Sequence, residues 1–188
     1  MTISPGSSLQ NRSSSFIRIW FFSLEGSLGI CILAGIAMAM ADLLLRLPLH
    51  VPGWRGLITM GLLVAARGLS GRAWGASAAA FAAALTSLAL AGPPRFSTLA
   101  FLIPGLVIDA VCLLGPRPWQ SSTLAAGLAA GLGNSAKFAV TLFGAAMLAR
   151  REGAGAVLLL PWLSHFGFGL CGGLIAAQLV KLSAAKRG

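Results

Sequence analysis

Long apolar runs are the feature that most constrains what this chain can fold into. Residues 123–148 and 156–182 carry few charged side chains over lengths that suit a bilayer crossing. Of the 188 residues, 57% are hydrophobic and 10% are charged, whereas about a quarter of an ordinary soluble domain is charged. This pattern predicts an integral membrane protein, and the lengths of the runs favour helices as the spanning elements.

Short polar connections divide the apolar sequence into six expected spans. These are residues 26–45, 57–69, 74–91, 96–114, 123–148 and 156–182. The second run is short, because a spanning helix needs about 20 apolar residues, and a five-span chain is therefore the alternative. We expect an all-α fold, an integral membrane bundle of six transmembrane helices. Residues 1–15 are expected to form a flexible tail, 16–183 a single transmembrane domain and 184–188 a basic C-terminal tail.

The basic residues are distributed as topology signals. The net charge is +10, but the cations lie in the chain ends and connections, which is typical of contacts with lipid headgroups and not of a nucleic-acid-binding patch. With six spans, eight cations fall on one side: Arg12, Arg18, Arg67, Arg72, Arg117, Lys181, Lys186 and Arg187. Five fall on the other: Arg46, Arg55, Arg95, Arg150 and Arg151. The bias favours both termini in the cytoplasm. The expected location is the cell's inner (cytoplasmic) membrane.

Polar residues inside the last three runs are the strongest functional signal. Counting about 1.5 Å of rise per residue puts Lys137 roughly 24 Å from the inner surface and His165 roughly 14 Å from the outer surface. Asn134 shares the face of Lys137 one turn deeper. These residues are predicted to meet at an outer cavity, the alternative being that Lys137 extends to the outer headgroups. Asp109, about 20 Å from the outside, either pairs with a cation or is protonated.

The connection "LPLHVPGWRG" combines restricted backbone with chemically versatile side chains. Two prolines limit its freedom, and His50, Trp54 and Arg55 bring an imidazole, a large ring and a permanent cation. Such a loop is suited to closing over an outer pocket. The alternative is a simple connector with an interfacial tryptophan.

Two further features concern partners and cofactors. In the first run, "AGIAMAMAD" places Ala37 and Ala41 one turn apart, which makes a smooth face for another helix. The three cysteines are widely separated and form no CxxC pair, so neither a metal nor a cofactor is expected. The chain has no GxxxxGK[ST] phosphate loop, so any transport energy is expected to come from other subunits.

Six short spans, the alanine pair, the Pro-rich outer loop and the polar residues of the last three spans resemble the substrate-binding component of energy-coupling factor transporters. The resemblance covers about residues 26–182. It implies a non-enzymatic subunit that captures a small vitamin-like molecule at the outer face and reorients with an ATP-driven partner module to release it inside. Ala37 and Ala41 would contact the transmembrane coupling subunit. By position, the substrate-binding residues would be His50, Trp54, Arg55, Asp109, Asn134, Lys137 and His165.

Two other functions fit parts of the sequence. Ser135 and His165 resemble the serine and histidine of intramembrane rhomboid proteases, although Ser135 lacks the GxSG context. The second alternative is an adaptor that holds partner proteins through glycine- and alanine-rich faces, which leaves Lys137 and Asp109 without a role.

Overall fold

A computed structural model describes residues 7–44, 52–91, 100–115, 122–149 and 159–186. Within these residues the fold is all-helical, with six helices and no strand. The helices are α1 (Ser7–Leu44), α2 (Arg55–Ser70), α3 (Gly75–Ala91), α5 (Leu102–Leu114), α7 (Thr123–Ala149) and α8 (Leu159–Ala185). Each predicted run contains one helix, so the all-α expectation is confirmed.

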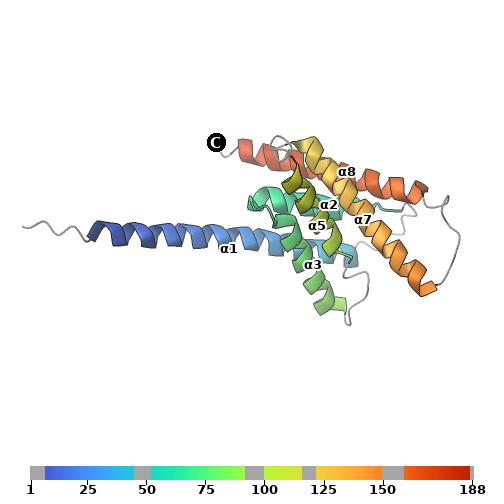
Figure 1. The fold of residues 1–188 in the computed structure, drawn as a ribbon, viewed down its shortest axis with the longest axis horizontal. Helices are drawn as coiled ribbons and strands as arrows, with labels where there is room; N and C mark the ends of the chain where they lie inside the picture. Colours follow the sequence, from blue (N-terminus) through green and yellow to red (C-terminus); the bar gives the residue numbers. More distant parts are fainter. Residues whose placement is uncertain (1–6, 45–51, 92–99, 116–121, 150–158, 187–188) are drawn as a thin grey trace, which may run out of the picture.

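The first helix is longer than its apolar run. It begins at Ser7, so residues 7–15, which the sequence assigns to a flexible tail, are helical. The N-terminal part of α1 extends well beyond the other helices (Figure 1). The polar and aromatic residues before the apolar run therefore continue one helix.

The helices form two layers that cross each other. α1, α2 and α8 run along the long axis of the molecule, and α3, α5 and α7 run obliquely across them (Figure 1). Contacts link α1 to α2 and α2 to α8 within the first layer, and α3 to α5 and α5 to α7 within the second. The short helix α2 contacts all five of the others, so it is the central element of the fold.

Small residues allow the helices to approach α2 closely. A methyl group added at Gly172 of α8 would overlap the backbone carbonyl oxygen of Leu57, and one added at Gly61 of α2 would lie 3.3 Å from the carbonyl oxygen of Gly172. Nine of the residues in the main buried cluster are alanines: Ala66, Ala76, Ala79, Ala80, Ala83, Ala129, Ala130, Ala176 and Ala177. This packing of small side chains is typical of helix contacts inside membranes.

Large apolar side chains lie on the outside. Leu44, Leu114 and Leu160 are 70%, 87% and 76% exposed, and many other leucines are similar. Two segments, Glu25–Leu44 and Leu159–Ala185, are long and apolar enough to cross a membrane. Only 22% of the most apolar window of each is buried, whereas a core helix of a soluble protein is mostly buried. The helical fold is therefore compatible with a membrane protein.

Candidate ligand-binding cavity

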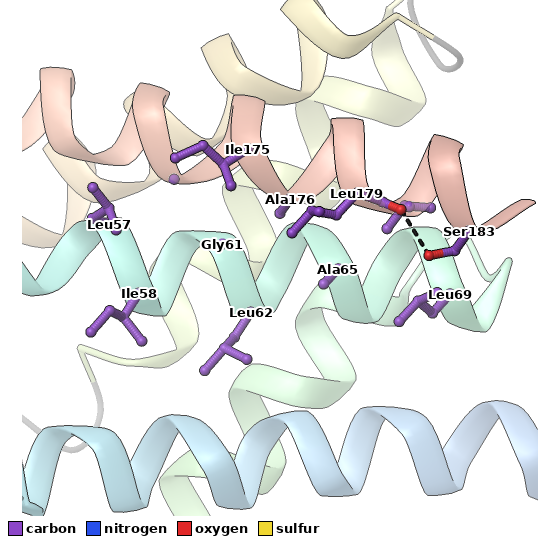
Figure 2. Close-up of a pocket in the computed structure, with 12 residues that line it drawn as sticks. Leu57, Ile58, Gly61, Leu62, Ala65, Leu69, Ile175, Ala176, Leu179 and Ser183 are labelled. Carbon is purple, nitrogen blue, oxygen red and sulfur yellow. Dashed lines mark hydrogen bonds between the residues drawn. The ribbon is translucent and has the colours of Figure 1, made fainter.

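An apolar groove and a polar cavity beside α2 differ in chemistry. An apolar groove of about 390 Å³ lies between α2 and α8 and is lined by residues such as Leu57, Gly61 and Ile175 (Figure 2). Its one polar side chain, Ser183, donates its hydroxyl to the carbonyl oxygen of Leu179 at 2.8 Å (Figure 2). The groove thus offers little to a polar ligand.

A second cavity, of about 430 Å³, lies at the N-terminal end of α2 and is rich in polar groups. We call it the Lys137 cavity. The end of α1, the start of α2, the middle of α7 and the first half of α8 form its walls. Its lining residues are Asp42, Gly53, Trp54, Arg55, Gly56, Asn134, Lys137, Phe138, Thr141 and His165.

The turn that precedes α2 is held against α8. Gly53 has φ of +84°, a left-handed conformation that glycine adopts without strain. A methyl group at Gly53 would lie 2.8 Å from Cα of His165, so the close approach also requires glycine. The hydroxyl of Ser164 donates to the carbonyl oxygen of Pro52 at 2.5 Å. The N–H of Gly56 donates to the carbonyl oxygen of Gly53 at 2.8 Å. These contacts place Trp54 and Arg55 at the cavity.

Asn134 connects three of the walls. Its side-chain amide donates to the carbonyl oxygen of His165 at 2.7 Å, which ties α7 to α8. The residue is 2% exposed, and a methyl group at Gly56 would overlap its amide. Asn134 therefore positions the cavity walls as well as lining them.

The charges in the cavity do not cancel. Arg55 pairs with Asp42 at 3.3 Å, and its guanidinium carbon lies 6.0 Å from the ring centroid of Trp54. Lys137 has neither an ion pair nor a side-chain hydrogen bond with any residue that the structure describes. Its ammonium lies 4.3 Å from the ring centroid of Phe101, a cation–π contact that lowers the cost of burial without neutralising the charge. One net positive charge remains.

Flat rings complete the cavity. The ring of His165 stacks on that of Phe138, with centroids 4.5 Å apart and planes 24° from parallel. The buried Nδ1 of His165 has no hydrogen-bond partner within the described part of the chain. The arrangement offers a cation and aromatic surfaces, which suits a small anion with a planar group.

Asp109 lies outside this cavity. Its carboxylate pairs with Arg67 and accepts hydrogen bonds from the N–H of Ser77 at 2.7 Å, the hydroxyl of Ser77 at 2.6 Å and the N–H of Ala76 at 3.4 Å. These amides belong to the first turn of α3, where a negative charge is favourable. Asp109 thus joins α2, α3 and α5, and of the two alternatives left open for it, the structure has the pairing with a cation. The partner is Arg67, not Lys137.

The structure brings together five of the seven predicted substrate-binding residues. Trp54, Arg55, Asn134, Lys137 and His165 line one cavity, whereas Asp109 does not, and His50 lies outside the described residues. Asp42, Phe138 and Thr141 also line it. Helical spacing from Lys137 could have indicated Thr141, which lies one turn further along α7. Asp42 lies near the end of the first apolar run, and only the packing of α1 against α2 brings it to the Lys137 cavity.

The remaining predicted residues have separate environments. Ala37 is exposed, whereas Ala41 lines a small cleft against the start of α2. Ser135 is 5% exposed, does not line the Lys137 cavity, and its hydroxyl has no hydrogen-bond partner among the described residues. It therefore lacks the contact with His165 that a serine–histidine dyad requires. No cluster of three metal-binding side chains occurs in the described ranges.

Comparisons with protein-family models, with curated proteins and with solved structures found no match. Function must therefore be argued from the geometry of the cavity itself.

Proposed function

We propose that this chain is the substrate-binding component of an energy-coupling factor importer and captures a small organic anion in the Lys137 cavity. The observation that carries the proposal is the isolated ammonium of Lys137 within a cavity of ligand size. A cation in an apolar environment needs a compensating partner, and no described residue forms an ion pair or a hydrogen bond with this ammonium. A bound anion would do so.

The membrane setting of the proposal is a six-span bundle in the cytoplasmic membrane with both termini inside. Its support is the combination of small buried side chains, exposed leucines and two long apolar helices. In this orientation the Lys137 cavity faces outward, because Lys137 and His165 both fall in the outer half of their helices.

The cavity favours a particular class of substrate. Asp42 and Arg55 neutralise each other, which leaves Lys137 to attract one negative group. The rings of Trp54, Phe138 and His165 favour a planar body of the size of a single or fused heterocycle. Because Asp109 is engaged elsewhere, the cavity suits a planar carboxylate.

Capture and release would use different parts of the chain. The turn at Gly53 and Trp54 would cover the bound molecule from outside. A transmembrane coupling subunit with ATPase subunits would then reorient the bundle, and Ala37 offers an exposed small residue for that contact. No ATP is consumed by this chain in the proposed cycle.

The test is the affinity of the Lys137→Met variant. Small molecules retained by the purified protein are identified by mass spectrometry, and the compound found is measured by equilibrium dialysis against both proteins. Because a hydrogen bond to a charged group contributes roughly 1.5–3 kcal/mol, the variant should bind at least about tenfold more weakly. Lys186→Met, which removes an exposed charge at the end of α8, should bind as the native protein does. Equal affinities of the native protein and Lys137→Met would refute the proposal.

A further inference from the structure

A second polar cavity lies at the opposite end of α2. It has a volume of about 480 Å³ and is bounded by the ends of α2, α5 and α8 and the start of α7. We call it the basic cavity. Its polar lining consists of Arg67, Arg72, Ser122, Thr123 and Lys181. Arg67 follows Arg55 by twelve residues, so the two cavities are separated by roughly 18 Å along α2.

The lining of the basic cavity is strongly positive. Three side chains from separate segments contribute cations, and no carboxylate lines it. Asp109 neutralises Arg67 from one side, and Arg72 and Lys181 bring two further basic side chains to the lining. The structure describes three carboxylates, of which Asp42 and Asp109 form ion pairs. Both pairs are with arginines of α2. Lys181 therefore has no carboxylate partner among the described residues.

The geometry of the walls adds to this charge. Ser122 and Thr123 stand at the N-terminus of α7, where the helix dipole is positive, and the Ser122 hydroxyl accepts a bond from the N–H of Ala125 at 3.4 Å. Val64, Ala126 and Val180 supply apolar wall, and low local polarity strengthens electrostatic attraction. Cations, hydroxyl groups and a helix N-terminus together match the several oxygens and the charge of a phosphate group.

We propose that the basic cavity binds a phosphate group, carried either by an anionic lipid or by free phosphate. The surroundings suit the lipid source, because Leu113, Leu124 and Leu182 near this end are 54%, 61% and 53% exposed and offer contacts for acyl chains. The site does not depend on the proposed transport function, since it shares no residue with the Lys137 cavity.

The experiment measures binding of defined probes to the full chain in an uncharged detergent. Dioctanoyl phosphatidylglycerol is titrated and counted by native mass spectrometry, and dioctanoylglycerol provides the same acyl chains without phosphate. Sodium phosphate is titrated separately by isothermal calorimetry against sodium chloride of equal ionic strength. Saturable binding of either phosphate compound, with none of dioctanoylglycerol, is expected, and the stronger ligand identifies the source.

Variants test whether the phosphate compound binds in the basic cavity. Lys181→Gln and Arg72→Gln should each weaken binding of the phosphate compound by about tenfold, because each removes one charge-assisted contact. Lys186→Gln removes a charge from the same end of α8 without altering the cavity and should bind as the native protein does. Arg72 also donates to the hydroxyl of Ser27 at 3.4 Å, so Arg72→Gln could disturb the fold. In that case the affinity of Lys181→Gln alone tests the proposal. The proposal is overturned if neither compound binds, or if Lys181→Gln and Lys186→Gln bind equally.

Discussion

Removal of the Asp109 carboxylate should destabilise the fold far more than removal of an exposed carboxylate. The side chain of Asp109 is 6% exposed and that of its partner Arg67 is 17% exposed, so the Asp109→Ala variant leaves a largely buried cation without its counter-charge. Ser77 and Ala76 also lose their acceptor. Breaking a buried pair by removing one partner costs about 3–5 kcal/mol. We expect the free energy of unfolding to fall by that amount.

The cysteines of the chain provide the assay. Cys31 and Cys112 are buried, whereas Cys171 is exposed. Cys112 lines the basic cavity, so the background carries both Cys171→Ser and Cys112→Ser, and a thiol-reactive dye then reports unfolding through Cys31, which is 1% exposed. Unfolding is followed as a function of denaturing detergent in mixed micelles, and the midpoint and slope give the free energy. The variant should unfold at a clearly lower fraction of denaturing detergent than its parent.

Two comparisons separate the buried pair from a general effect of charge. Asp42 and Arg55 are 38% and 45% exposed, so Asp42→Ala should cost less than about 1 kcal/mol. Adding Arg67→Ala to Asp109→Ala removes the unpaired cation, and the double variant should lose less than the sum of the single losses. If Asp109→Ala is no less stable than Asp42→Ala, the carboxylate does not hold α2, α3 and α5 together.

The glycines give two further predictions, both measured with the same dye. Gly172→Ala should cost about 1–3 kcal/mol, because the added methyl meets backbone of α2, whereas Gly167→Ala meets nothing within 4 Å and should be neutral or stabilising by up to about 1 kcal/mol. Gly53→Ala and Gly71→Ala both place alanine at positive φ, but only at Gly53 does the methyl also meet α8, so Gly53→Ala should be the more destabilising and the more harmful to ligand affinity. Equal effects within either pair would contradict the packing described.

The sequence predicts the helices well because apolar runs and polar breaks are local signals. It also predicts that Lys137, Asn134 and His165 lie together, because helical rise sets their depth and helical period sets their face. The partner of Asp109 was not predictable in the same way. Arg67 lies near the end of a run that is too short to be a secure span, and a separation of 42 positions in the sequence gives no local pattern that links the two residues.

The central position of α2 also depends on information that hydropathy lacks. By length alone, the short second run is only a weak candidate for a spanning helix. Here α2 is buried because glycines and alanines on its neighbours allow five helices to approach it. Packing between helices also explains why some residues that line the Lys137 cavity were not predicted. Asp42 reaches the cavity only because the end of α1 packs beside the start of α2.

The ion pairs of α2 determine which cations each cavity offers to a ligand. Arg55 and Arg67 are matched to carboxylates from other helices, so in the two proposals Lys137 would attract the ligand at one end of α2 and Lys181 at the other. The two cavities lie roughly 18 Å apart along α2, so a side chain that lines one cavity cannot contact a ligand in the other. We therefore expect Lys137→Met to leave phosphate binding unchanged and Lys181→Gln to leave binding of the organic anion unchanged, each within about twofold. Measuring both ligands against both variants tests this independence. Loss of both ligands in either variant would mean that α2 moves when one cavity loses its charge, and that the two sites are coupled through the helix.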